Sequence, residues 1–561
     1  MVSLSSLRFS FRPRLWTSLK DYRREDLAAD VGAGVTVALV ALPLAMAFGI
    51  ASGVRPDQGI ATAVVGGLLV SLLGGSKVQI AGPAGAFVAL LYAVVEKYGV
   101  ANLLIATMMA GVMLFAMGAF RLGTLVRFVP VAIVTGFTTG IAMIIALSQV
   151  RDFLGLAVER MPSNFFSQVA TLWASLHTVN WTAVAIGLSC LLMIVVWPTP
   201  QTAKLGNWRF LTAKLPSTVV VLALSAFAVW ALELQVETIG TRFGALPRGL
   251  PAPELPSFDW ATAQNLFGPT IAIALLGAIE SLLCARVADG LIGDRHDPNQ
   301  ELMAQGVANF VSPLFGGIAV TGTIARTMTN VKGGARSPVS GIVHAVTLFV
   351  MILALAPQAS YIPLAALGAV LIWVAFNMVP WRDLRELPKF SMFYRAILVS
   401  TLLLTVIFDL IVAFEVGLVL SSLFFIYRIS SLTKVDPMPL GDAATLPDGR
   451  TVGVWQLFGS IFFASVTKIE NLIDPAKPLP DVVILEMHKV INIDTTGLDA
   501  LESLHNTLKR RGDRLILAGL NEQPLSLLKR SGVIEDIGPE NVFDSLDAAL
   551  QAAAQPNPAA A

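Results

Sequence analysis

The chain has 561 residues, of which 55% are hydrophobic and 14% charged, and its mean hydropathy is +0.71. Soluble globular proteins carry about 25% charged residues, so this composition excludes that class and indicates an integral membrane protein. The net charge of +1 gives no reason to expect a nucleic-acid partner. The two cysteines, Cys190 and Cys284, lie inside apolar runs, which argues against a disulfide framework or a metal site.

Membrane-spanning helices are expected to fill the chain up to residue 431. A span needs about 20 predominantly apolar residues. Four segments are short or interrupted, namely 57–74, 83–97, 301–315 and 323–331, and the long run at 404–427 splits into two helices. The count is about fourteen, seven in each half, with the clear candidates at 29–49, 100–120, 127–149, 178–197, 216–232, 266–288, 338–356, 363–379 and 393–411.

Two of the interrupted segments share a pattern, in which a short apolar run stops at a glycine and a helix follows. The first runs from Gly74 to Pro83, and the second runs from Gly316 to Thr323 and continues to Arg326. Non-helical backbone at membrane depth is tolerated only where protein buries it or where it lines a cavity. A matched pair of broken segments in two halves of a chain is the best sequence pointer to a transporter's binding site.

The distribution of basic residues predicts the orientation, because cytoplasmic loops carry an excess of Lys and Arg. The N-terminal segment 1–28 is basic and shows no signal peptide. If this segment is inside, the basic loops at 199–215 and 381–395 also fall inside, and the acidic loop at 233–265 falls outside. We therefore expect a multi-pass protein of the cell inner (plasma) membrane with both termini in the cytoplasm.

Beyond residue 431 the pattern becomes that of a soluble domain. The stretch 432–450 is rich in Pro, Gly and Asp and is expected to be a linker. Residues 451–553 predict a small α/β domain, and the Ala/Pro-rich tail at 554–561 is expected to be disordered. The expected strands are 452–457, 460–464, 482–487 and 514–518, and the expected helices are 498–510, 525–529 and 542–553.

Several short stretches resemble a known family, the SulP anion transporters (solute carrier family 26 in animals). They occur in the family's order over nearly the whole chain. They are Asp30–Gly34 with Leu42–Ala47, the Gly82-Pro83 turn, Leu276–Ala285, and Gly316–Arg326, while Asp494-Thr495-Thr496-Gly497 resembles the signature of a STAS domain (sulfate transporter and anti-sigma factor antagonist).

The resemblance implies an all-α transport domain at residues 29–431 and a cytoplasmic α/β STAS domain at 451–553. The transport domain would be a seven-plus-seven inverted repeat, with a core that moves against a gate as an elevator. Family members are generally homodimers, and acyl carrier protein is a partner that the resemblance suggests for the STAS domain. Within the family the chain is most similar to bacterial C4-dicarboxylate transporters, through Leu276–Ala285 and the Pro43–Ala47 form of the first helix.

Arg326 is the first candidate for anion binding. A guanidinium stays charged at physiological pH, and a lone charge at membrane depth is costly and usually functional. Arg326 lies one turn into a short helix that follows the break at Gly322, where free N–H groups also favour an anion. Thr323, Ile324 and Ala325 would border the same site. A snorkelling arginine or a structural ion pair is the alternative.

The partner half-helix begins after Pro83. Ala84, Gly85 and Ala86 are small, so their backbone amides could approach the same anion from the other side; close helix packing is the alternative. By resemblance, Phe48 lines the pocket wall, with ordinary packing as the alternative. Leu44 stands where many family members have Gln, which removes one polar ligand.

Glu280 is the candidate for proton coupling. It lies about nine residues into an apolar span, about 14 Å deep and close to the midplane. A carboxyl group crosses a membrane far more cheaply when neutral than when charged. One alternative is a fixed counter-ion to Arg326, and another is a sodium site, although a single carboxylate offers few oxygens for Na⁺.

Thr495 matches the position that carries a phosphorylatable hydroxyl in anti-sigma factor antagonists, and Asp494 and Thr495 are also good helix N-caps. No cofactor, metal cluster, P-loop or nucleophile–base arrangement is evident, so enzyme activity is not expected. The sequence predicts a secondary active anion transporter, with proton-coupled symport of C4-dicarboxylates such as succinate, fumarate and aspartate. The alternatives are a bicarbonate or sulfate transporter coupled to Na⁺ or H⁺, and an anion channel.

Overall fold

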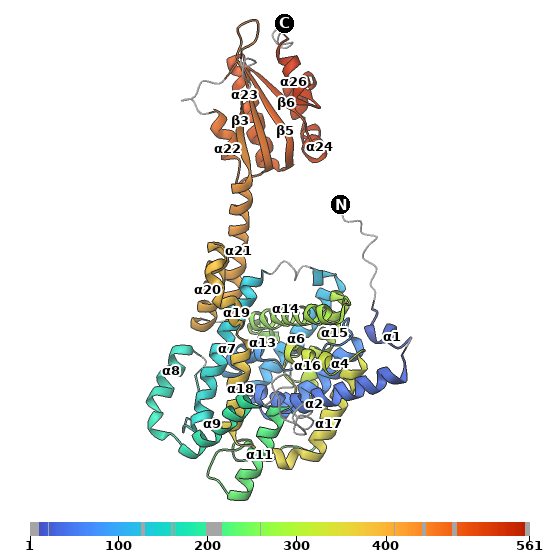
Figure 1. Cartoon of the computed structure of the whole chain (residues 1–561), viewed down its shortest axis with the longest axis vertical. Coiled ribbons are helices and arrows are strands. Elements are labelled where there is room, and N and C mark those ends of the chain that lie inside the picture. The colour runs from blue at the N-terminus through green and yellow to red at the C-terminus, as the bar shows by residue number, and fades with distance from the viewer. Residues whose placement is uncertain are drawn as a thin grey trace. The chain divides into compact units, whose positions relative to one another are not determined.

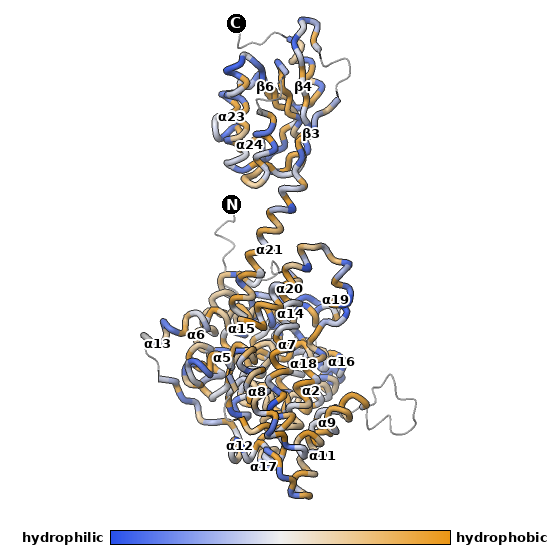
Figure 2. The backbone as a smooth tube through the Cα atoms, turned by 90° about the vertical axis from the view of Figure 1, so that its left-hand side faces the viewer, coloured by the Kyte–Doolittle hydropathy of each residue, from blue (hydrophilic) through white to orange (hydrophobic). Residues whose placement is uncertain are grey.

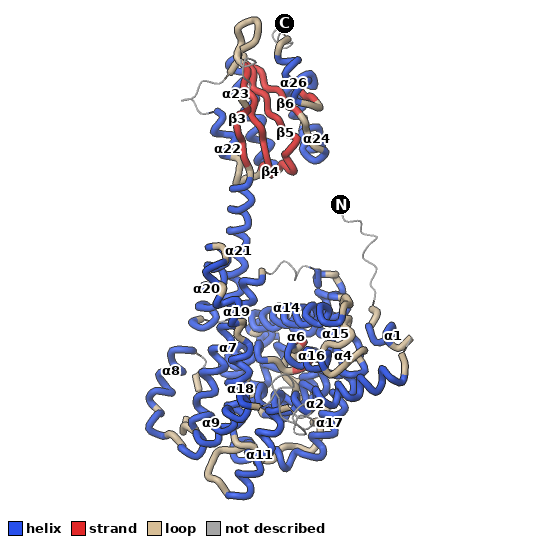
Figure 3. Tube along the Cα trace, in the orientation of Figure 1, coloured by secondary structure: helices blue, strands red, loops and turns tan. Residues whose placement is uncertain are grey.

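Helices build the first of the two units into which the chain divides, residues 1–418, and a five-stranded sheet marks the second, residues 419–561 (Figure 1 and Figure 3). The computed structural model describes residues 11–20, 22–124, 130–158, 161–162, 164–197, 216–257, 260–408, 410–439, 445–473 and 480–555. Residues 440–444 of the expected linker and 556–561 of the expected tail lie outside these ranges.

Fourteen described segments correspond to the fourteen spans that the sequence predicts. Seven are long and apolar enough by themselves to cross a membrane: α2 (Arg24–Ala51), the segment Pro56–Leu73, α6 (Val100–Ala119), α7 (Val131–Leu154), α14 (Phe267–Ile292), α17 (Val339–Ala359) and most of α21 (Leu410–Leu432). Four are shorter apolar helices: α9 (Trp181–Val196), α11 (Ser217–Leu232), α18 (Leu364–Met378) and α20 (Met392–Ile407). The other three are α15 (Pro298–Val311) and the strand–helix segments β1–α5 and β2–α16.

Short elements complete the first unit. Within Pro56–Leu73, the π-helical turn η2 (Thr62–Gly66) separates α3 (Pro56–Ala61) from α4 (Gly67–Leu73). The connections contain α1 (Arg14–Ser18), α8 (Phe165–Ala174), η5 (Leu176–Thr178), α12 (Ile239–Phe243), α13 (Trp260–Asn265), η6 (Ser312–Phe315), α19 (Trp381–Arg385) and η7 (Leu387–Lys389). Figure 2 shows that hydrophobic residues dominate most helices of this unit, as lipid-facing segments require.

The two broken segments of the sequence pair with each other. β1 (Ala81–Gly82) and β2 (Thr321–Gly322) are antiparallel, with Ala81 opposite Gly322. The turn η3 (Gly85–Phe87) leads from β1 into α5 (Val88–Tyr98), and α16 (Ile324–Lys332) follows β2. The chain therefore places the starts of two half-helices, one from each half of the sequence, beside one short sheet.

The described residues that precede α2 are held against the rest of the first unit. The Arg14 side chain donates to both Asp294 oxygens at 2.8 and 2.6 Å, and Lys77 Nζ lies 3.0 Å from the same carboxylate. Burial alone would raise the pKa of Asp294, but the hydrogen bonds from Arg14 and Lys77 outweigh it and lower the pKa to about 2. This carboxylate therefore contributes stability above its unfolded pKa of about 3.9, and the contribution is lost as the pH falls through 2.

The second unit is an α/β domain with strand order β3-β4-β5-β6-β7, in which β3 is antiparallel to β4 and the other neighbours are parallel. Apolar residues of α23 and α24 pack on one side of the sheet and those of α26 on the other. The elements are β3 (Lys434–Met438), β4 (Val452–Ile461), α22 (Thr467–Glu470), η9 (Asn471–Ile473), β5 (Val482–Ile493), α23 (Thr495–Arg511), β6 (Arg514–Ala518), α24 (Glu522–Ser531), α25 (Val533–Ile537), η10 (Pro539–Asn541), β7 (Val542–Phe543) and α26 (Leu546–Ala553).

Three local predictions for this unit differ from the structure. The two strands expected at 452–457 and 460–464 are one strand, β4, because Gly459, with a φ of +96°, absorbs a register irregularity. Part of the expected linker forms β3, since Val435 packs on the buried cluster beneath the sheet. The helix expected from 542 begins at Leu546, where the Ser545 side chain caps it.

Candidate functional site

Side chains support the backbone where β1 and β2 cross. Asn309 donates to the Val320 carbonyl and accepts from the Val320 N–H, both at 2.8 Å. The Ile80 N–H donates to Thr327 Oγ1 at 3.0 Å. These bonds satisfy polar groups that two-residue strands leave open, which is the condition for irregular backbone at membrane depth. The crossing is therefore a specifically supported feature of the first unit.

Arg326 is the largest side chain that the structure buries almost fully, with 1% of its surface exposed. Its Nη2 donates to the Pro83 carbonyl at 3.1 Å, while Nη1 has no hydrogen-bond partner among the described residues. Nη1 also lies against Gly82, where an added Cβ would come within 2.5 Å of it. The sequence predicted that Arg326 borders the anion site. In the structure the guanidinium lies against the backbone that precedes α5, so its charge adds to the partial positive charge of the helix start.

The start of the other half-helix, Ala84–Ala86, is buried among residues from three helices. A Cβ added at Gly85 would lie 3.1 Å from Met378 Sδ, 3.2 Å from the Phe48 ring and 3.5 Å from Ile145. Phe48 thus lies beside the predicted site. Met378 of α18 and Ile145 of α7 were missed, because apolar residues within spans carry no signal until the fold brings them together.

The start of α16 is only partly turned toward the crossing. Thr323 is its N-cap residue and is buried, and its Oγ1 donates to the Ile80 carbonyl at 3.0 Å. Ile324 is half-buried and Ala325 is exposed. The structure therefore brings Thr323 to the crossing, whereas Ala325 does not belong to the buried set.

Replacing Gly322 by alanine is expected to disrupt this crossing. An added Cβ would lie 1.9 Å from Gln79 Nε2, which itself donates to Ser281 Oγ at 2.8 Å. Overpacking of this kind costs about 1–3 kcal/mol, and here it also breaks a buried hydrogen bond. Thermal unfolding of the purified protein should show a lower Tm for Gly322→Ala. Gly290→Ala is the matched control, because it adds the same methyl group to a glycine where no described atom lies within 4 Å of the added Cβ. Equal Tm values for the two variants would contradict the prediction.

Glu280 shares a face of α14 with residues that contact β2. The Gly277 carbonyl accepts a hydrogen bond from Thr321 Oγ1 at 3.2 Å, and Cys284 lies 3.2 Å from the Cβ position of Gly322. Positions 277, 280 and 284 fall on one face at helical spacing. The half-buried Glu280 makes no hydrogen bond or ion pair with any residue that the structure describes. The alternative of a fixed pair with Arg326 is therefore not observed in this conformation.

Two buried ionisable residues near the crossing were missed. Glu301 of α15 accepts from the Gly75 N–H at 3.0 Å and from Ser281 Oγ and Gln305 Nε2, both at 3.2 Å. His344 of α17 is fully buried, and neither ring nitrogen has a partner in the described part of the chain. In the sequence these two residues appear only as an acid and an imidazole inside apolar segments. That pattern alone does not show whether the residue serves the fold or the function.

Thr495 lies in the second unit as the first residue of α23, and it is exposed. Asp494 is the N-cap, and its side chain accepts from the Gly497 N–H at 2.8 Å. The capping role expected for Asp494 is present, while the Thr495 hydroxyl is accessible.

Comparison with known proteins covers both units. The model of the Sulfate permease family matches residues 27–401, and that of the STAS domain matches residues 446–549. YvdB of Bacillus subtilis (strain 168) is 39% identical over 96% of this chain and 99% of its own length. The bicarbonate transporter BicA of Picosynechococcus sp. is 28% identical over 94% of each chain, and the chloroplastic sulfate transporter 4.1 of Arabidopsis thaliana is 26% identical over 96% of this chain and 82% of its own.

Two solved structures are similar in fold. SLC26A9 superimposes with a TM-score of 0.83 at 18% identity, over 96% of this chain and 92% of that chain. The transmembrane domain of a cyanobacterial BicA gives a TM-score of 0.63 at 31% identity, over 70% of this chain and 98% of that domain. The fold class expected from the sequence, a seven-plus-seven helical transport domain followed by a STAS domain, is confirmed.

Proposed function

The chain belongs to the sulfate permease family, and from that premise we propose that it is a proton-coupled symporter of small dicarboxylates. The family consists of membrane transporters, so the chain is a multi-pass anion transporter and not an enzyme. The substrate and the coupling ion are the proposed parts. We also propose that Phe48, Ala84–Ala86 and Thr323 border the anion and that Arg326 supplies positive charge.

Glu280 is the observation that carries proton coupling. A carboxyl group inside a transmembrane helix, with no described cation or hydrogen-bond donor beside it, is costly to keep charged. If Glu280 takes up a proton whenever the site crosses the membrane, the loaded site carries one negative charge less than it would with an ionised Glu280. Coupling by this residue needs no further metal or cofactor.

Two substrate classes are compatible with the proposed site. Two helix starts and Arg326 favour oxyanions in general. The similarity to bacterial C4-dicarboxylate transporters favours succinate, fumarate or aspartate. Two relatives, the bicarbonate transporter BicA and the chloroplastic sulfate transporter 4.1, favour bicarbonate or sulfate, with H⁺ or Na⁺ as the driving ion.

Movement and assembly are proposed to follow the family. The half-helices would move as a core against α7 and α18, whose Ile145 and Met378 now touch the site. We propose a homodimer in the inner membrane with both termini in the cytoplasm, and acyl carrier protein as a ligand of the STAS domain. Phosphorylation of the exposed Thr495 would add charge at the start of α23.

Uptake into proteoliposomes tests the proposal. Labelled succinate should accumulate with saturation when the outside is acidic, and unlabelled fumarate should compete. Uptake of bicarbonate or sulfate alone would select the second candidate, and dependence on Na⁺ without dependence on pH would reject proton coupling. Large unitary chloride currents in planar bilayers would indicate a channel instead.

A further inference from the structure

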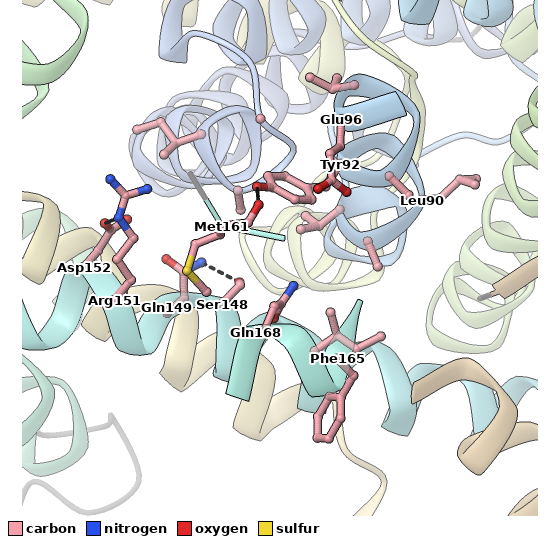
Figure 4. A pocket seen from close by; sticks show the side chains of 18 of the residues that line it. Leu90, Tyr92, Glu96, Ser148, Gln149, Arg151, Asp152, Met161, Phe165 and Gln168 are labelled. Carbon is pink, nitrogen blue, oxygen red and sulfur yellow. Dashed lines mark hydrogen bonds and ion pairs between the residues drawn. The ribbon is translucent and has the colours of Figure 1, made fainter. Parts of the chain in front are cut away.

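A crevice of about 760 Å³ leads away from the candidate anion site (Figure 4). Its walls come from α2 and α5 on one side and from α7, α8, α12 and α20 on the other. Its lining includes Val88, the first residue of α5, and Ile144, whose neighbour Ile145 lies against Gly85. The crevice therefore approaches the half-helix start where an anion is proposed to bind.

One end of the crevice, called its mouth below, is lined by the C-terminal end of α2, on the face opposite to the N-terminal segment. α2 begins at Arg24 beside that segment and ends at Ala51, which lines the crevice. Arg151 and Asp152, in the last turn of α7, line the same mouth. An anion that enters from this face meets these charges before it reaches α5.

The two arginines of the mouth differ in how well they are paired. Arg242 of α12 donates Nε and Nη2 to the two Glu237 oxygens at 2.8 and 2.5 Å, and Nη1 to Asp152 at 2.9 Å. Arg151 Nε lies 3.9 Å from the same Asp152 oxygen and has no hydrogen-bond partner among the described residues. The Arg151 side chain is 18% exposed. Arg242 is thus saturated by two carboxylates, while the Arg151 guanidinium keeps donors for an incoming anion.

We propose that this crevice is the entry path of the anion from the face opposite to the N-terminal segment, and that Arg151 docks the anion there before it reaches the half-helix starts. The ligand class is a small oxyanion, a carboxylate, sulfate or bicarbonate, which a planar guanidinium binds through two N–H groups. The proposal rests only on anion transport and not on the choice of substrate or coupling ion.

The surroundings of Arg151 make the docking weak, as an entry path requires. Asp152 is beside it, Glu237 and Arg242 neutralise each other, and Glu96 lines the crevice from α5. Figure 4 shows Arg151 and Asp152 side by side, across the crevice from Tyr92 and Glu96. The Asp152 carboxylate offsets part of the arginine charge, so an anion held there is released inward rather than trapped.

Cysteine labelling tests the proposal in the full-length transporter. Ser148→Cys, or Phe165→Cys if the first variant does not transport, places a thiol in the crevice of a protein whose own Cys190 and Cys284 are buried. A membrane-impermeant anionic thiosulfonate, added to the face of the mouth, should react faster than its cationic analogue. A transported anion should slow the reaction. With Arg151→Gln in addition, the ratio of anionic to cationic rates should fall roughly two- to fivefold, and half-protection should need roughly two- to fivefold more anion.

The controls distinguish loss of the Arg151 charge from a defect in folding and from a failure of the proposed anion transport. Arg248→Gln removes the same charge from an exposed residue that does not line the crevice, and it should leave both values unchanged. A fold defect would alter both reagent rates alike, whereas loss of the docking charge alters their ratio. No labelling from this face, or an unaltered ratio and protection in Arg151→Gln, overturns the proposal. If no anion tested is transported by the wild type, the proposed function fails independently of this result.

Discussion

Uptake by an Arg326→Ala variant is expected to fall to background for every anion that the wild type carries. The guanidinium is buried beside the start of α5, and no described carboxylate neutralises it. A unit charge about 5 Å from an anion is worth about 3 kcal/mol at an effective dielectric near 20, which corresponds to roughly 100-fold in affinity. Ligand-dependent thermal shifts and initial uptake rates would both report this loss.

Folding must be separated from binding in that experiment, because truncation also leaves the Pro83 carbonyl without its donor. Arg326→Lys keeps the charge and loses the planar fork, so it should fold and bind with intermediate affinity. If Arg326→Ala folds with unchanged thermal stability and binds the anion as tightly as the wild type, the charge has no part in the site. If both Arg326→Ala and Arg326→Lys lose anion affinity, the hydrogen bond from the guanidinium to the Pro83 carbonyl, rather than the charge, shapes the site.

The sequence predicted the spans well, because apolar length is a local property. The glycine breaks at Gly82 and Gly322 also located the crossing. A break in an apolar segment indicates non-helical backbone at membrane depth, which must be buried by protein or line a cavity. The pairing of β1 with β2 follows from the inverted repeat rather than from either segment alone. The shared pattern of the two broken segments, rather than hydropathy alone, therefore indicated that two stretches far apart in the chain belong to one site.

Side-chain orientation was the part that the sequence did not determine. Arg326 was expected to border the anion, and its guanidinium reaches across β1 to the Pro83 carbonyl, a contact that the sequence does not indicate. Ala325, only one residue earlier, points away and is exposed. Ile145 and Met378 became part of the site only through helix packing. One-residue differences in helix rotation decide such contacts. Apolar periodicity does not resolve them for α7 and α18, which are apolar on most sides.

Replacing Glu280 by glutamine is expected to preserve folding and anion binding and to abolish the dependence of uptake on the proton gradient. The amide has the shape of the neutral acid but holds no exchangeable charge. With the membrane potential clamped, an inward gradient of one pH unit supplies about 1.4 kcal/mol per proton, so a one-proton symporter accumulates its anion about tenfold. The Glu280→Gln variant should instead equilibrate the anion across the membrane and retain anion–anion exchange.

The choice of variants distinguishes Glu280 from its neighbours. Glu280→Asp keeps an ionisable group on the same face of α14 and should retain pH-dependent uptake with a shifted profile. Glu301 is held by three hydrogen-bond donors, so Glu301→Gln should mainly lower thermal stability. If the proton gradient still drives accumulation in Glu280→Gln but not in a folded Glu301→Gln, then Glu301 carries the proton and Glu280 is structural. If Na⁺ dependence, rather than pH dependence, disappears in Glu280→Gln, the carboxylate belongs to a sodium site, and the isolated Glu280 of this conformation would have to gain oxygen ligands when the transporter binds its ions.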